Sequence, residues 1–201
     1  DDTKYDYDYN KADDGNDLDE TIDFEFLVVM NFECDDKLHY YGATGGKIRR
    51  DIRNTITMNI PKNSHNWVYI EKMIHYVVNN HFDTYMKTAN EKDYKGNEFI
   101  LQDYIIQKNE KNKGFYHSHN DFMISKKENV FRYATVIIYL NTLTEGGNTI
   151  FWDEYKEQPI AGKLIIFPSN WTFQHEGEMP ISNDKYIITA WICCRVNNRL
   201  L

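Results

Sequence analysis

The stretch YATVIIYLN, residues 133–141, is rich in β-branched and aromatic residues, a composition typical of a buried β-strand. Short runs of the same kind lie on both sides of it and are separated by turn residues such as the pair Gly146–Gly147. These runs are FILQDYII (99–106), GFYHSH (114–119), TIFW (149–152), KLIIF (163–167) and KYIITAWI (185–192). Short strands at this spacing predict an all-β sandwich or barrel that is supported by helix from the preceding part of the chain.

The N-terminal half carries the helical signal. Apolar residues between 66 and 88 recur at the three-and-four spacing of one helical face, and Ser64 or Asn66 is a candidate N-cap. The residues on that face are Trp67, Ile70, Ile74, Val77, Val78, Phe82 and Tyr85. Before this helix, Phe24–Met30 (FEFLVVM) predicts a strand that opens the folded domain, and Arg49–Ile60 predicts a second strand that ends at Pro61.

Length and charge set the domain organisation. The 201 residues are enough for one domain with a sizeable core, which we expect to span residues 23–201. Residues 1–22 are mostly Asp, Tyr, Asn and Lys, so we expect an acidic, flexible tail, with a recognition segment for a basic partner as the alternative. The net charge of −8 argues against nucleic acid as the partner and favours a cationic or neutral peptide.

The cysteines and the absence of long apolar runs bear on the compartment. Cys34, Cys193 and Cys194 are too few for a disulfide framework, which favours a reducing compartment. No apolar run approaches the roughly 18 residues of a membrane span, and no signal-peptide core is visible. Because the chain begins at Asp1, an upstream anchor or targeting segment remains possible, so the localisation stays open.

The triplet His119-Asn120-Asp121 is the first candidate for chemistry. Residues two apart on a strand share a face, so His119 and Asp121 can reach one metal ion. His175, in FQHEG after the strand KLIIFP, is the expected third ligand. Two imidazoles and a carboxylate that leave positions open suit Fe(II), although zinc remains an alternative. His117 shares the same strand parity and could also approach the metal.

Lys185 is the second candidate, because it opens the strand KYIITAWI on the same face as Ile187, Thr189 and Trp191. A lysine on the inward face of a β-barrel is costly unless it meets an anion. A dicarboxylate cosubstrate would supply that anion.

From about Ile100 to Ile192, the order and spacing of motifs resemble the catalytic domain of prolyl 4-hydroxylases, in the 2-oxoglutarate- and Fe(II)-dependent dioxygenase superfamily. The matching residues are Tyr104, Tyr116, His119-x-Asp121, Arg132, Thr135, Tyr139-Leu140-Asn141, Gly146-Gly147-Asn148-Thr149, Gly162, Phe167, His175, Lys185 and Trp191. The resemblance implies a mostly β fold with flanking helices (α+β). Its core would be a double-stranded β-helix, a cupin-like jelly-roll, with helices packed on one sheet.

The resemblance also implies the roles of the residues. His119, Asp121 and His175 would bind Fe(II), and Lys185 would pair with the far carboxylate of 2-oxoglutarate. Hydroxyls for the same carboxylate would come from Tyr104, Tyr139, Thr149 or Thr189, and the substrate side would include Tyr116, His117, Arg132 and Trp191. O2 would be the oxidant, ascorbate the reductant, and a proline-containing peptide or protein the substrate. Because Asp121 is a carboxylate rather than a small residue, hydroxylation is expected and not halogenation.

Two departures from the family pattern affect the expected substrate. The segment IIQKNEKNKGF (105–115) is longer and more basic than the family's turn, and Lys108–Lys113 is either a lid over the peptide or a solubilising surface. Arg49, Arg50 and Arg53 are either groove residues or surface arginines. Two alternatives therefore stay open: an oxygenase for another residue or a small molecule, and an inactive, cupin-like metal-binding protein.

Overall fold

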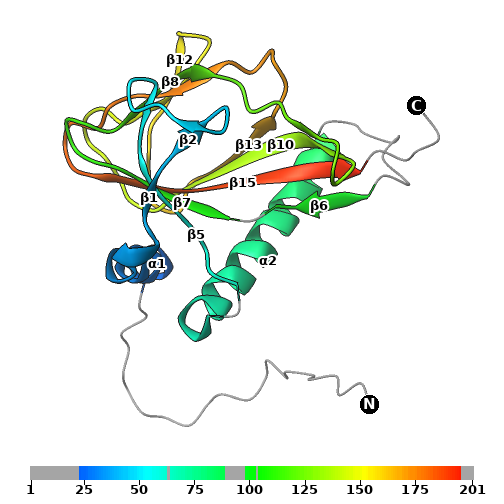
Figure 1. Ribbon diagram of the computed structural model, residues 1–201, viewed down its shortest axis with the longest axis horizontal. Coiled ribbons are helices and arrows are strands. Elements are labelled where there is room, and N and C mark those ends of the chain that lie inside the picture. The colour runs from blue at the N-terminus through cyan, green and yellow to red at the C-terminus, as the bar shows by residue number, and fades with distance from the viewer. Residues whose placement is uncertain (1–22, 63, 89–97, 103, 196–201) are drawn as a thin grey trace.

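The structure is a computed structural model that describes residues 23–62, 64–88, 98–102 and 104–195. Two antiparallel sheets face each other as a double-stranded β-helix, and two helices cover the outside of the larger sheet (Figure 1). The larger sheet has the order β1-β5-β7-β15-β10-β13, with β6 paired to β15 and β9 to β10. Its strands are β1 (Tyr40–Tyr41), β5 (Ile56–Asn59), β6 (Phe99–Leu101), β7 (Ile105–Asn109), β9 (Ile124–Ser125), β10 (Val130–Tyr139), β13 (Leu164–Pro168) and β15 (Lys185–Arg195).

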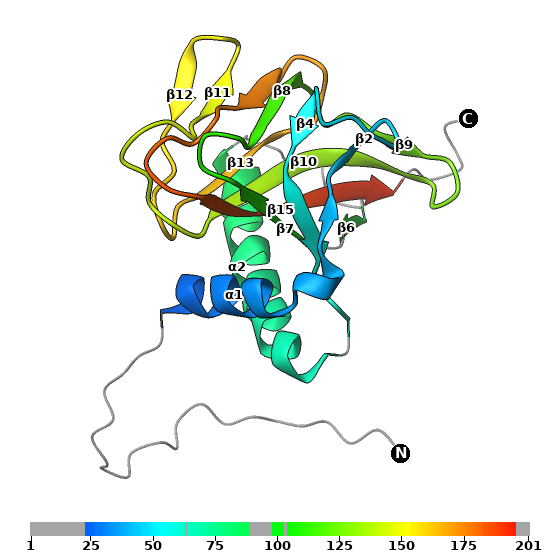
Figure 2. The same cartoon turned by 60° about the vertical axis from the view of Figure 1, so that its left-hand side comes forward.

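The smaller sheet lies on the side of the larger sheet that faces away from the helices (Figure 2). Its order is β12-β11-β14-β8-β4, and a separate hairpin, β2-β3, lies near it. These strands are β2 (Ala43–Thr44), β3 (Lys47–Ile48), β4 (Arg53–Asn54), β8 (Phe115–His119), β11 (Thr149–Phe151), β12 (Tyr155–Glu157) and β14 (His175–Gly177). The expected jelly-roll with helices on one sheet is confirmed.

Strand β15 shows how alternation separates the core from the site. Ile188, Ala190 and Ile192 point to the helices and join the main hydrophobic core. Lys185, Ile187 and Thr189 alternate with them and face the smaller sheet, where they line a cavity. The register with β10 pairs Ile188 with Ile138 and Thr189 with Ile137, so both central strands keep the same two faces.

The predicted helix is α2 (His65–Thr88), and its buried residues are those of the predicted face, including Trp67, Ile74 and Phe82. The carbonyl of Ser64 accepts hydrogen bonds from the backbone N–H groups of Trp67 and Val68, so the helix begins after Ser64 rather than at Asn66.

The predicted strand Phe24–Met30 is wrong. This segment belongs to α1 (Phe24–Cys34), which precedes a short 3-10 turn, Asp36–Leu38. The Asp23 carboxylate caps it by accepting from the Glu25 backbone N–H at 3.0 Å. Val28 and Phe32, one turn apart, are fully buried, and this packing outweighs the β-propensity of the sequence.

The predicted strand Arg49–Ile60 is two strands in different sheets. Arg53–Asn54 pairs with β8, whereas Ile56–Asn59 pairs with β7, so the chain crosses between the sheets at Thr55. In the segment Lys108–Lys113, Lys108 lies on β7 and residues 111–113 form a turn. Lys111 in this turn donates to the carboxylate of Asp184 and the carbonyl of Ser182, and Lys108 is paired with Glu33.

In the part of the chain that the structure describes, no helix is long and apolar enough to cross a membrane. Cys34, Cys193 and Cys194 are free thiols, and the latter two are buried as expected for a core strand. The predicted acidic tail, residues 1–22, lies outside the described residues.

Candidate metal centre and cosubstrate cavity

The three predicted ligands come together where two neighbouring strands of the smaller sheet, β8 and β14, end and begin. His119 ends β8, Asp121 follows two residues later, and His175 opens β14, directly opposite His119 in the register. The Nε2 atom of His119 lies 3.8 Å from Asp121 Oδ1, and the Nε2 atom of His175 lies 3.7 Å from Asp121 Oδ2. All three ligand atoms lie within 4.8 Å of one another, a spacing that one ion can bridge.

Backbone carbonyls orient both imidazoles. His119 Nδ1 lies 2.8 Å from the carbonyl oxygen of His117, and His175 Nδ1 lies 3.0 Å from that of Phe173. A proton on each Nδ1 satisfies these carbonyls and leaves each Nε2 lone pair free for a metal. Burial, with the charge of His175, lowers the pKa of His119 to about 4, so this ring is neutral at neutral pH. The spacing to Asp121 is therefore that of metal ligands, not of a salt bridge.

The hydroxyl groups of Thr135 and Ser169 form a hydrogen-bonded chain that ends on the Asp121 carboxylate. Thr135 on β10 donates to Asp121 Oδ2 at 2.8 Å, and its Oγ1 is also 2.8 Å from the hydroxyl of Ser169. Burial opposes ionisation of Asp121, but His175, His119 and the Thr135 hydrogen bond outweigh it and lower its pKa. The site therefore offers two imidazoles and one carboxylate, a set that fits Fe(II) with open positions.

Thr135→Val should weaken Fe(II) binding and turnover by roughly 10–100-fold, because Asp121 loses the donor that orients it. Titration of the protein with Fe(II) and a succinate-release assay would measure both effects. Thr84→Val, on the exposed face of α2, is the matched control. Equal Fe(II) affinity in the two variants would contradict the positioning role of Thr135.

The ligands open into a cavity of about 560 Å³ between the two sheets. Lys185 lies in this cavity, and only 2% of its surface is exposed to solvent. Within the described residues no carboxylate lies within salt-bridge distance of its ammonium group. Burial lowers the pKa of Lys185 to about 8, because a buried ammonium group without a paired anion is unfavourable.

Hydroxyl groups and a close backbone turn surround Lys185. Tyr139 donates to Thr149 Oγ1 at 2.7 Å, and the Tyr139 ring centre lies 5.5 Å from the lysine Nζ. Gly147 has φ +71°, and a side chain there would collide with Leu143 beside Lys185. The Gly-Gly turn thereby lets the chain bring Thr149 into the cavity. The unpaired lysine and these hydroxyls fit the far carboxylate of a dicarboxylate.

Two cavity residues escaped the sequence reasoning. Gln107 donates to Thr189 Oγ1 at 2.7 Å, and its own oxygen accepts from Arg53 at 3.0 Å. Asn109 lies two residues further along β7 on the same cavity-facing side. The sequence pattern that could have identified them is alternation along the strand, because Gln107 and Asn109 lie on the face opposite to the apolar residue Ile106.

The structure places Tyr104 away from the expected cosubstrate position. Its side chain is buried in the core beneath the larger sheet, and its hydroxyl lies 3.2 Å from His75 on α2. His117 does not line the cavity either, since its exposed ring packs against Phe115.

The other three predicted substrate residues do line the cavity. Tyr116 stacks on His119 with ring centres 3.6 Å apart, and the Arg132 guanidinium lies 3.6 Å from the Trp191 ring centre. Tyr116, Arg132 and Trp191 thus line the same cavity as the metal-binding side chains.

Comparisons with known proteins agree with this arrangement. The sequence profile of the 2OG-Fe(II) oxygenase superfamily matches residues 99–193, the segment that contains all three ligands and Lys185. A search of curated proteins finds no significant match.

Solved structures share the fold at low identity. A Trichoplax adhaerens prolyl hydroxylase, in complex with a peptide fragment of the hypoxia inducible factor oxygen degradation domain, has a TM-score of 0.65 and 18% identity over 84% of this chain and 77% of that one. The viral collagen prolyl hydroxylase of Paramecium bursaria Chlorella virus-1, solved as a 2OG complex, has a TM-score of 0.56 and 20% identity over 86% of this chain and 90% of that one. A Pseudomonas putida prolyl-4-hydroxylase has a TM-score of 0.56 and 18% identity over 85% of this chain and 87% of that one.

Proposed function

We propose that the chain is a 2OG-Fe(II) oxygenase that hydroxylates peptidyl proline, since the profile of that superfamily matches residues 99–193. Its His-x-Asp…His triad is that of a 2-oxoglutarate-dependent dioxygenase. With 2-oxoglutarate and O2, Fe(II) in such a triad supplies the oxidation of a substrate C–H bond, while 2-oxoglutarate is converted to succinate and CO2.

Two groups of residues in the cavity would have different roles, one in binding the metal and one in binding 2-oxoglutarate. His119, Asp121 and His175 would hold Fe(II). Lys185 would bind the far carboxylate of 2-oxoglutarate, and the side chains of Thr149 and Thr189 line the same cavity. Ile137 and Ile187 give this cavity apolar surface, which would exclude water from the cosubstrate chain.

One observation carries the choice of a proline-rich peptide: an exposed aromatic pair beside the metal centre. Phe122 follows Asp121 directly, lines the cavity and is 41% exposed. Trp171, 66% exposed, packs edge-on against it with ring centres 5.6 Å apart. Exposed aromatic surfaces bind polyproline II segments, which are already extended and lose little entropy on binding. The peptide bound to the Trichoplax adhaerens enzyme is a precedent in a related fold.

We expect proline-containing peptides to gain one oxygen on proline when incubated with the enzyme, Fe(II), 2-oxoglutarate and ascorbate. Phe122→Ala and Trp171→Ala should each raise KM for the peptide by about tenfold, because each removes aromatic contact area worth about 1–2 kcal/mol. Tyr155→Ala, an exposed aromatic on the β11–β12 hairpin, is the matched control and should leave KM unchanged. Mass spectrometry and succinate release would measure both.

The alternatives give different results in the same assay. An oxygenase for a free metabolite or another residue would release succinate with that compound and add no oxygen to proline. A binding protein without turnover would release no succinate with any compound.

A further inference from the structure

The cavity contains more positive charge than the cosubstrate requires. Arg53 and Arg132 line it together with Lys185, whereas the carboxylates that line it are Asp121 and Glu176. Asp121 is a metal ligand. Within the described residues, neither arginine has a carboxylate within the 4.0 Å of a salt bridge.

Arg53 is held by neutral acceptors alone. Its guanidinium donates to Thr55 Oγ1 at 2.9 Å, to the Ala43 carbonyl at 3.2 Å and to Gln107 Oε1 at 3.0 Å. Its face also lies 4.7 Å from the ring centre of Tyr116, which itself stacks on His119. At position 42, a side chain would collide with the guanidinium, so Gly42 keeps the space that Arg53 occupies. These contacts fix the direction of the cation but do not neutralise it.

Arg132 is less well satisfied. Its Nε is buried without a hydrogen-bond partner, and its Nη1 donates a long hydrogen bond of 3.5 Å to the Asp121 carbonyl. The guanidinium stacks on Trp191, whose indole Nε1 is likewise buried without a partner. Two buried donors without an acceptor are uncommon in a folded protein, so the described residues leave Arg132 incompletely satisfied. Arg132 also lines the cavity, where a ligand has access to its side chain.

Electrostatics point the same way. Burial lowers the pKa of both arginines, the charge of Asp121 opposes this shift at each, and the charge of Arg53 adds to it at Arg132. Asp121 would be shared with the metal, and bound 2-oxoglutarate would place one carboxylate on the metal and the other on Lys185. The two guanidiniums would then have no carboxylate of their own.

We propose that the substrate peptide carries a carboxylate close to the hydroxylated residue, and that the guanidiniums of Arg132 and Arg53 bind it. This inference rests on the proposed function and narrows its substrate class to acidic peptides. It replaces the expectation of a cationic or neutral peptide that the net charge of −8 suggested, because the charge that lines the cavity differs in sign from the charge of the whole chain. The carboxylate is either an Asp or Glu side chain or the peptide's own C-terminus.

The test uses proline peptides that differ only in a residue next to proline: Asp, Asn or Lys, with both termini blocked. A fourth peptide has Asn and a free C-terminal carboxylate. Binding is measured by fluorescence anisotropy with Fe(II) and 2-oxoglutarate but without O2, and hydroxylation is measured separately by mass spectrometry. The Asp peptide should bind about tenfold or more tightly than the Asn peptide, since a charge-assisted hydrogen bond to a buried cation is lost in the latter. If the free terminus is the natural anion, the fourth peptide binds most tightly instead.

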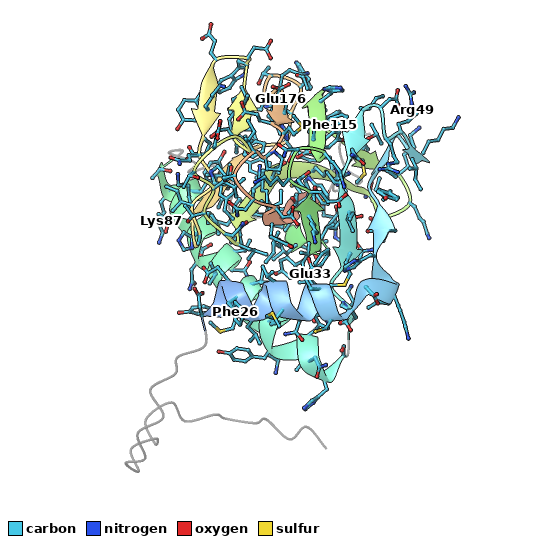
Figure 3. All side chains as sticks on the ribbon, turned by 90° about the vertical axis from the view of Figure 1, so that its left-hand side faces the viewer. Phe26, Glu33, Arg49, Lys87, Phe115 and Glu176 are labelled. Atoms are coloured by element: carbon cyan, nitrogen blue, oxygen red, sulfur yellow. The ribbon has the colours of Figure 1, made fainter. Side chains whose placement is uncertain are left out.

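Variants assign the effect to residues. Arg132→Gln and Arg53→Gln should each reduce the preference for Asp over Asn, and Arg132→Lys should keep part of it. Arg49→Gln is the matched control, because Arg49 projects from the edge of the molecule, 52% exposed and paired with Asp51 (Figure 3). The comparison of peptides on the wild-type enzyme stands even if a variant fails to fold.

The possible failures are distinguishable. Equal binding of all four peptides by the wild-type enzyme, or a preference unchanged in both arginine variants, overturns the inference. If acidic peptides bind preferentially but proline gains no oxygen, the inference stands and the proposed prolyl activity is wrong.

Discussion

Asp121→Ala should abolish turnover, with a loss larger than the roughly 10–100-fold expected when an outer-shell partner such as Thr135 is removed. Asp121 is the single carboxylate among the three ligands, so its removal leaves two imidazoles and no ligand charge to balance Fe(II). His119→Ala and His175→Ala should have similar effects. Succinate release and Fe(II) retention after gel filtration would measure the loss.

Controls separate loss of metal from loss of fold. Asp51→Ala removes an exposed carboxylate that pairs with Arg49, and this change should leave activity intact. Thermal unfolding of Asp121→Ala should show that the protein still folds. Chelation should inactivate the wild-type enzyme, and Fe(II) should restore activity better than Zn(II). Normal turnover in any of the three ligand variants would exclude this triad as the catalytic centre.

The sequence predicted the ligands because their spacing along the chain is short or tied to strand ends. His119 and Asp121 are only two residues apart, which is close enough to reach one ion even though Asp121 lies just beyond the end of β8. The distance between His119 and His175 was not predictable, because it depends on the pairing of β14 with β8, which are far apart in the chain. The resemblance to a known family supplied what residue patterns could not.

Tyr104 shows where motif matching gave a different answer from strand geometry. Tyr104 and Ile106 point to the helices, whereas Gln107 and Asn109 point to the cavity. Counting by two from either polar residue excludes Tyr104 from the cavity. Motif order alone assigned it to the cosubstrate, since a tyrosine near this position is common to the family pattern.

The N-terminal errors have a different cause. Helix α1 and the break at Thr55 are decided by tertiary packing, which local propensity does not record. Glu33 and Phe26 lie on the same helix (Figure 3); Phe26 is exposed, whereas Glu33 accepts hydrogen bonds from Lys108 and Tyr186. The contacts that hold α1 come from α2 and from strands far along the sequence.

Lys185→Ala should weaken 2-oxoglutarate binding by a few kcal/mol, roughly 100-fold, because the far carboxylate would lose its buried cationic partner. Fe(II) affinity should be nearly unchanged, since Lys185 is not a ligand. Calorimetric titration with 2-oxoglutarate would measure the change, and Lys163→Ala, whose lysine pairs with Glu157 at the surface, is the matched control. An unchanged affinity in Lys185→Ala would show that another group holds the anion.

The pH dependence of the same titration tests the charge itself. Burial lowers the pKa of Lys185 to about 8 in the ligand-free protein, so the ammonium is present below that pH and is lost above it. The wild-type affinity for 2-oxoglutarate should therefore be constant at low pH and fall as the pH rises through about 8. Lys185→Arg should bind less tightly at pH 7, because the guanidinium has a different shape, but its affinity should not fall at pH 8–9, because arginine stays protonated. Parallel pH profiles for the two proteins would mean that Lys185 is not the titrating partner of the cosubstrate.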